Sequence, residues 1–162
     1  MSLSDEKIRE LLSKPQGLAK NAETRHNFRD LSSLNELWIA WAAGFIDGEG
    51  AVLIKRYAPC HGQPDGKITV MLDVNQKVPE PLFKLEEMFG GKVGYTESRN
   101  IYYWRIFGQA STRCLRVIRP YLLVKGEQAD LAIECQEVCF GTGVPFSVKL
   151  EYYERIKQLR RK

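Results

Sequence analysis

The chain has 162 residues, and its 24 Lys and Arg against 20 Asp and Glu give a formal net charge of +4 and a pI near 8.9. This length suits one domain with a core of its own, and the 44% hydrophobic and 27% charged fractions exclude a disordered tail, a collagen-like chain and a disulfide-stapled miniprotein. The longest apolar run, Leu37 to Ile46, is too short to cross a bilayer, so we expect no membrane contact.

The N-terminal part, residues 1–32, is predicted to be an accessory helical extension or arm ahead of one main domain, residues 33–162. Ser4 can cap a short amphipathic helix that carries Ile8. Residues 16–30 are polar and have no clear period, which suits a linker, an arm or part of a partner contact. Because no basic patch followed by an apolar run begins the sequence, we expect an intracellular protein.

A second helix is predicted from Leu34 to Ile46, with Ser33 and Glu36 as a capping-box pair at its start. The helix is apolar nearly all round, which indicates that it is buried on more than one side. A seam of small residues runs along it: Ala40, Ala43 and Gly44. Such a seam lets another backbone approach closely, as packing at a symmetric interface requires, although a central core helix of a monomer explains the same pattern.

Four strands and four further helices are predicted after this helix. Alternating or apolar runs between turn residues give strands over 51–57, 67–75, 93–97 and 101–107, and helices over 81–89, 109–119, 127–140 and 148–162. The order α-β-β-α-β-β-α with a helical tail predicts an α+β fold. We expect one four-stranded antiparallel sheet with helices on a single face.

Alternation along the strands gives the sheet a second, polar face. Its candidate contact residues are Lys55, Tyr57, Lys67, Thr69, Asp73, Asn75, Tyr95, Glu97, Arg99, Tyr103 and Arg105. This mixture of donors and acceptors can read DNA bases, since Arg and Lys donate to guanine while Asp and Glu accept from cytosine. Residues 51–125 hold 12 Lys and Arg against 6 Asp and Glu, a balance that suits a nucleic-acid surface and a solvated face equally. An ordinary solvated sheet face is the alternative.

The four cysteines permit, but do not favour, a zinc site. Cys135 and Cys139 are four positions apart on a predicted helix, and Cys60 precedes His61 in a loop. No paired CxxC spacing is present, so buried free thiols are the better interpretation.

The most informative segment, residues 42–50, reads Ala-Ala-Gly-Phe-Ile-Asp-Gly-Glu-Gly. Its acids, Asp47 and Glu49, stand at the C-terminal end of the predicted helix, where free carbonyls and the helix dipole disfavour negative charge. A divalent cation would compensate for this, with carboxylate oxygens and the carbonyl of Gly48 as hard ligands. Two solvated acids after a glycine-terminated helix are the alternative.

This segment resembles the LAGLIDADG motif of homing endonucleases, and the resemblance extends from about Asn35 to Lys162, element order included. A single motif in a chain of this size implies a homodimer through the motif helix, residues 34–46. The resemblance also implies two saddle-shaped sheets in the DNA major groove. The implied partner is double-stranded DNA with a long pseudo-palindromic target, and the implied location is a prokaryotic cytoplasm or the organelle that encodes the chain.

The resemblance assigns roles to five residues. Glu49 and the carbonyl of Gly48 would bind the catalytic divalent metal, Mg²⁺ first, with Mn²⁺ or Ca²⁺ able to substitute in binding. Asp47 matches the first acid of the motif, which supports the turn more than the chemistry. Gln76 matches a position that orders water, and Lys125 matches a basic residue beside the active site.

Two positions depart from the family pattern, because Glu49 stands where Asp is commoner and Glu80 stands where some relatives have arginine. The implied activity is that of a site-specific DNA endonuclease, encoded within an intron, that makes metal-dependent double-strand cuts with short 3′ overhangs. One alternative is an RNA maturase that aids intron splicing. The other is a sequence-specific DNA-binding regulator without cleavage, which loss of both motif acids would have favoured.

Overall fold

The computed structural model of the protein describes residues 4–13, 30–141 and 143–160, so nearly all of the predicted linker lies outside the described residues. The elements in chain order are α1 (Asp5–Ser13), α2 (Glu36–Glu49), β1 (Gly50–Tyr57), β2 (Lys67–Gln76), α3 (Glu80–Phe89), β3 (Lys92–Thr96), η2 (Glu97–Arg99), β4 (Ile101–Phe107), α4 (Gly108–Ile118), η3 (Arg119–Tyr121), α5 (Gly126–Cys139) and α6 (Phe146–Leu159). This order confirms the predicted α+β fold.

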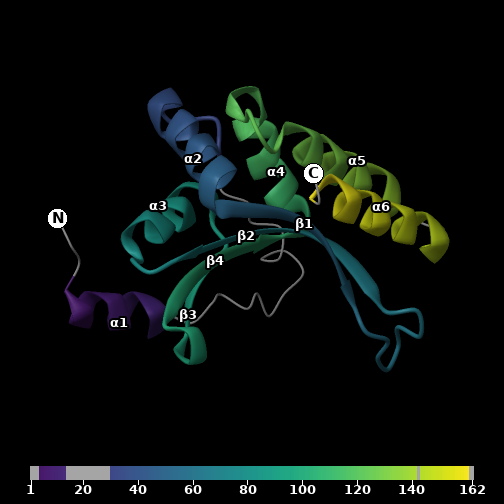
Figure 1. Cartoon of the computed structure of the whole chain (residues 1–162), viewed down its shortest axis with the longest axis horizontal. Coiled ribbons are helices and arrows are strands. Elements are labelled where there is room, and N and C mark those ends of the chain that lie inside the picture. The colour runs from purple at the N-terminus through teal and green to yellow at the C-terminus, as the bar shows by residue number, and fades with distance from the viewer. Residues whose placement is uncertain (1–3, 14–29, 142, 161–162) are drawn as a thin grey trace.

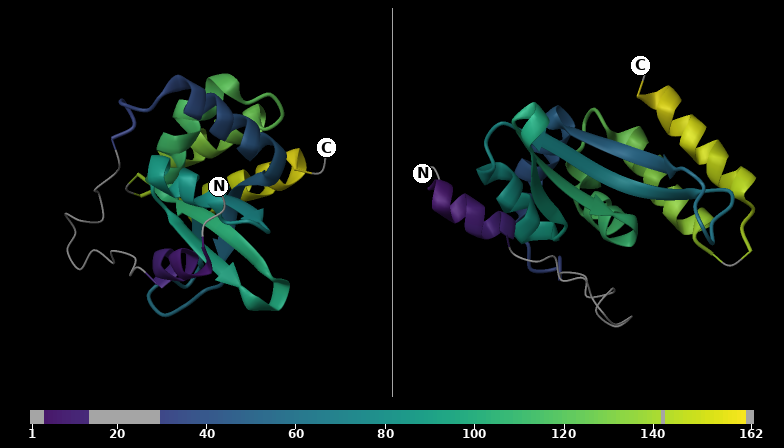
Figure 2. Two further views of the ribbon diagram at one scale, coloured as in Figure 1. Left: turned by 90° about the vertical axis from the view of Figure 1, so that its left-hand side faces the viewer. Right: turned by 90° about the horizontal axis from the view of Figure 1, so that it is seen from below.

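One antiparallel sheet of four strands, in the order β1-β2-β4-β3, organises the molecule. Helices α2 to α6 lie on one side of it, and α1 lies beside β3 at one end (Figure 1). Seen from below, the strands stand in front of α2 to α6, so these helices leave the other face, called here the open face, uncovered (Figure 2). The predicted division into a helix-covered face and an open face is therefore confirmed.

Apolar side chains from alternate strand positions form the core against the helices. Val74 on β2, Trp104 on β4 and Ile46 on α2 are all fully buried. Burial of one large apolar side chain contributes about 1.5–3 kcal/mol to the free energy of folding. The apolar residues at alternate strand positions therefore stabilise the packing of the sheet against the helices. The indole of Trp104 also donates a 2.8 Å hydrogen bond to the carbonyl of Gly90, which fixes the turn before β3.

The motif helix differs from its prediction at both ends. Asn35 is the N-cap, because its side chain accepts a 2.8 Å hydrogen bond from the N–H of Leu37, so the predicted cap at Ser33 is wrong. At the other end α2 continues to Glu49 instead of ending at Ile46, which places both motif acids in its last turn. Within the seam, Ala43 is buried in the chain's own core.

The cysteines follow the prediction of free thiols. Cys114, Cys135 and Cys139 are buried, whereas Cys60 is exposed in the loop after β1. Burial raises the pKa of the Cys114 thiol above its usual range, as expected for an inert core thiol. Among the helices that the structure describes, none has the length and apolar character needed to cross a membrane.

Candidate functional site

The carboxylate of Asp47 caps the loop that precedes α5. It accepts hydrogen bonds from the backbone N–H groups of Leu123 at 2.6 Å, Val124 at 3.0 Å and Lys125 at 2.9 Å. These donors compensate for a negative charge that the helix end disfavours, so Asp47 needs no metal ion for this purpose. The role in supporting the turn that the resemblance gave to Asp47 fits this geometry.

The protonation of Asp47 reflects the same contacts. Burial raises the pKa of its carboxyl, but the N–H groups of Val124, Leu123 and Lys125 and the positive charge of Lys125 outweigh burial and bring this pKa below its usual range. Asp47 is therefore ionised at neutral pH, which is the state that accepts all of these hydrogen bonds.

Lys125 is tied to the same helix end through its side chain. Its ammonium group donates a hydrogen bond to the main-chain carbonyl of Asp47, while its backbone N–H donates to the Asp47 carboxylate. Lys125 thus holds a fixed positive charge at the negative end of α2. The structure brings together two residues that the sequence analysis linked only through the resemblance.

Glu49, in contrast, is open to solvent. Its side chain is exposed and forms no hydrogen bond or ion pair with any residue that the structure describes. Gly48 is exposed as well, and Gln76 ends β2 two positions beyond Val74, the residue that pairs with Gly50. The register therefore brings Gln76 to the edge of the sheet at which α2 passes into β1.

The donors at this edge fit part of a site for a hard cation. No group of three or more His, Cys, Asp or Glu side chains that could hold a metal occurs in residues 4–13, 30–141 and 143–160. Glu49 and the carbonyl of Gly48 are nevertheless the oxygen donors that Mg²⁺ prefers, and proteins usually hold Mg²⁺ with one or two carboxylates while substrate phosphates complete its shell. One copy of the chain supplies such a partial set, and the remaining ligands would come from outside it.

Most of the predicted contact residues lie on the open face of the sheet. The strand register places on it Lys55, Tyr57, Lys67, Asp73, Asn75, Tyr103 and Arg105. Thr69 shares this face but is only 7% exposed, so the expectation that it is free for contact is wrong. It is a short side chain on a central strand, with Lys55 of β1 opposite it in the register.

Three other predicted contact residues lie elsewhere. Tyr95 pairs with Tyr102, which belongs to the face of Trp104, so the assignment of Tyr95 to the open face is wrong. Its hydroxyl donates a 2.6 Å hydrogen bond to Asn100. A 3₁₀ turn joins β3 to β4 and holds the other two residues, Glu97 and Arg99, which are exposed there and not on a strand.

The sequence analysis missed a cluster on the open face. Arg105 donates from Nε to the carboxylate of Asp73 at 3.1 Å, and its guanidinium carbon lies 4.2 Å from the centre of the Tyr103 ring. The Tyr103 ring lies against Gly94, where a Cβ would come within 2.3 Å of Cζ and Oη of that ring. A glycine inside a predicted strand is a signal of such a close approach, and it could have identified this cluster.

The sequence analysis also missed two exposed apolar residues beside the site. Leu123 is 92% exposed, and Val124 next to it is exposed too, although a Leu-Leu-Val run would ordinarily be expected in a core. Leu37 and Trp38, at the start of α2, are further large apolar side chains in contact with solvent. These exposed apolar residues lie on α2 and on the loop held by Asp47.

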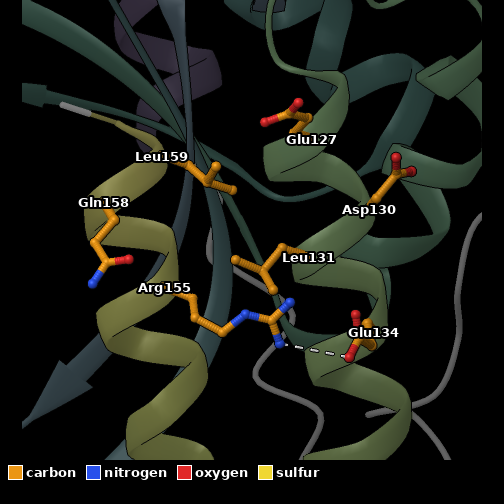
Figure 3. Close-up of a pocket in the computed structure, with 7 residues that line it drawn as sticks. All are labelled: Glu127, Asp130, Leu131, Glu134, Arg155, Gln158 and Leu159. Atoms are coloured by element: carbon orange, nitrogen blue, oxygen red, sulfur yellow. Dashed lines mark ion pairs between the residues drawn. The ribbon is translucent and has the colours of Figure 1, made fainter. Parts of the chain in front are cut away.

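The hollow between α5 and α6 is a different feature (Figure 3). It is lined by Glu127, Asp130, Leu131, Glu134, Arg155, Gln158 and Leu159, none of which was predicted to be functional. Its acidic residues come from α5, and the charge of Arg155 lies 3.7 Å from Glu134. The excess of carboxylates would repel phosphate groups, so this hollow does not fit a nucleic acid.

Comparison with known proteins gives similarity at the level of structure alone. No family model and no curated protein matches the chain. The solved structure of the homing endonuclease I-CvuI, in complex with the I-CreI target in the presence of Mg, is 24% identical with a TM-score of 0.69, over 76% of this chain and 82% of that one. An archaeal intron-encoded homing endonuclease complexed with DNA, I-Vdi141I, is 15% identical with a TM-score of 0.67, over 76% and 84%.

A third solved structure, the LAGLIDADG homing endonuclease I-SmaMI bound to cleaved DNA, is 20% identical with a TM-score of 0.61. It matches over 80% of this chain and 44% of its own. The structural neighbours are thus LAGLIDADG homing endonucleases, and the chain adopts the homing endonuclease fold.

Proposed function

We propose that the chain is a site-specific, metal-dependent DNA endonuclease of the homing type. It acts as a homodimer, is encoded within an intron and leaves short 3′ overhangs. The observation that carries this proposal is the C-terminal end of α2 on the fold of homing endonucleases. There the Glu49 carboxylate is exposed and has no partner among the described residues, while the Lys125 ammonium is held at the carbonyl of Asp47. Several solved neighbours are complexes with DNA, and one was solved with its target in the presence of Ca.

Each residue of the helix end has a role in phosphodiester hydrolysis. A divalent ion held by Glu49 and the Gly48 carbonyl would supply charge neutralisation at the scissile phosphate and an activated water. Lys125, fixed against the Asp47 carbonyl, stabilises the negative charge that develops on the phosphate oxygens. Gln76 orients water at the end of β2. The supporting residue is Asp47, which holds the backbone of the Lys125 loop.

The open face of the sheet is the proposed DNA interface. The B-DNA major groove is about 12 Å wide and admits a two-stranded β-ribbon, and the long β1–β2 hairpin has that form. Lys55 and Lys67 would contact phosphates or guanines, whereas Asp73 and Asn75 add acceptors that purely electrostatic binding does not need. The mixture favours sequence-specific recognition. Residues 33–162 would form the nuclease domain, with residues 1–32 as an extension.

A second copy of the chain is the proposed partner along α2. Gly44 is exposed, and a Cβ built there would meet no neighbouring atom of the described residues within 4 Å, so their packing does not require glycine at this position. Leu37, which is 79% exposed, and Trp38 lie on the same helix, with Leu123 on the adjacent loop. A close helix pair at a twofold axis would cover these side chains and bring two copies of Glu49 together.

The proposal is tested by cleavage of a plasmid library that carries the host gene without its intron, or randomised sites where that gene is unknown. We expect discrete double-strand cuts in Mg²⁺ and none in EDTA. Tight DNA binding without cuts in Mg²⁺ would contradict the nuclease and favour a DNA-binding regulator. RNA binding without DNA cuts would favour a maturase.

A further inference from the structure

We propose that Arg105 is a preordered reader of guanine and sets a required G·C pair in each half of the DNA target, with Asp73 and Tyr103 as its positioning residues. This inference rests on the proposed function, since it assigns a specificity to one row of the open sheet face. That row is set by the register, in which Asp73 of β2 pairs with Arg105 of β4, and Arg105 pairs with Lys92 of β3.

The first constraint on Arg105 is an aromatic platform. Gly94 leaves room for the Tyr103 ring to lie across β3, because any larger residue would place a Cβ 2.3 Å from that ring. The guanidinium of Arg105 then stacks on Tyr103 with its central carbon 4.2 Å from the ring centre. Tyr103 therefore lies on the open face and also supports the guanidinium of Arg105.

The second constraint is an ion pair made through a single nitrogen. Nε of Arg105 donates to Asp73 at 3.1 Å, and the Asp73 side chain is 15% exposed. This contact uses Nε, the guanidinium nitrogen nearest to the main chain. Neither Nη1 nor Nη2 has a hydrogen bond with any residue in 30–141 or 143–160, and the Arg105 side chain is 37% exposed. The N–H groups of these two nitrogens therefore remain as donors to an acceptor outside the chain.

Two fixed guanidinium donors match one base edge in the major groove. Guanine presents O6 and N7 there as a pair of acceptors, and arginine bound to both is the commonest specific contact. Because Tyr103 and Asp73 already restrict the Arg105 rotamer, little side-chain entropy remains to be lost on binding. In the register Asp73 pairs with Ala51, which follows Glu49 by two residues, whereas Lys55 lies further along β1. The guanine that Arg105 contacts therefore lies in the inner part of the half-site, meaning the part nearer to Glu49.

The test is a binding selection from a duplex library with a randomised segment, done in EDTA with the wild type, Arg105→Lys, Asp73→Asn and Lys149→Ala, followed by sequencing. We expect the wild type to enrich guanine at one position in each half-site by about 10-fold or more over other bases. Arg105→Lys keeps the charge but loses the planar donor pair, so the preference at that position alone falls. Asp73→Asn lowers the guanine preference at this position less than Arg105→Lys does. Lys149→Ala on α6, the control, leaves the guanine preference unchanged.

The outcomes separate this inference from the proposed function. If the wild type enriches a target and cuts it in Mg²⁺, but Arg105→Lys retains every base preference, the inference is overturned and the nuclease stands. If the library shows no enrichment at all, both fail. Thermal unfolding of each variant excludes a loss of fold as the cause of a changed base preference. Tyr103→Phe keeps the aromatic ring under Arg105, so we expect this variant to retain the guanine preference.

Discussion

Asp47 and Lys125 are joined twice, once through the backbone N–H of Lys125 to the Asp47 carboxylate at 2.9 Å and once through the Lys125 ammonium to the Asp47 carbonyl. Asp47 therefore holds Lys125 in place, whereas the Glu49 carboxylate has no such partner among the described residues. Two acids separated by one glycine have different roles because one faces the loop before α5 and the other faces solvent.

We predict that Asp47→Asn destabilises the fold by about 1–3 kcal/mol at pH 7, since charge-assisted hydrogen bonds to three N–H groups are weakened. Urea unfolding measures this change in the free energy of unfolding. Asp65→Asn, in the exposed loop between β1 and β2, is the matched control and should change it little.

The same contact predicts a pH dependence with a definite sign. The folded-state pKa of Asp47 lies below its ordinary value of 3.8, so its contribution to stability is present above about pH 4 and is lost as the pH falls through the folded-state pKa. The difference between wild type and Asp47→Asn should therefore stay constant from pH 7 to about pH 4 and shrink as the pH falls further. A difference that stays constant below about pH 4, down to the pH at which the wild type unfolds, would argue against an ionised Asp47 as the origin.

We predict that Lys125→Met lowers the cutting rate by roughly 100-fold, the usual effect of removing one group that stabilises transition-state charge. Stability should change much less than with Asp47→Asn, because the backbone N–H of Lys125 still reaches the carboxylate. Lys149→Met, on α6 at the helical side of the molecule, serves as the control. An unchanged single-turnover rate for Lys125→Met would remove this residue from the site.

Gly44→Leu should abolish dimerisation, because the added side chain separates helices that approach along α2. Within one chain a side chain at this position meets open space, so the variant should still fold. Light scattering should give the 18.6 kDa mass of one chain for the variant and twice that mass for the wild type. Glu151→Leu, at an exposed position of α6, should leave the mass unchanged. Equal masses for Gly44→Leu and the wild type would contradict the interface.

The limits of sequence reasoning can be traced to particular residues. Period-two alternation predicts which residues of β1, β2 and β4 face the helices. Val74 and Trp104 are buried because they stand at alternate positions on the one face that the helices cover. The hydrogen bonds between Asp47 and the loop before α5 join segments far apart in the chain, so no local pattern reveals them. Tyr95 was assigned to the wrong face although it lies two positions after the apolar Val93, which is buried, so alternation along β3 places both on the covered face.

The most direct test of the central claim compares Glu49→Gln with the wild type on a mapped target in Mg²⁺. The substitution removes one negative charge and leaves the open sheet face intact. We expect Glu49→Gln to retain its DNA affinity in a gel-shift assay and to lose double-strand cutting. Cutting by Glu49→Gln at the wild-type rate would contradict the assignment of Glu49 as the metal ligand, and with it the proposed active site.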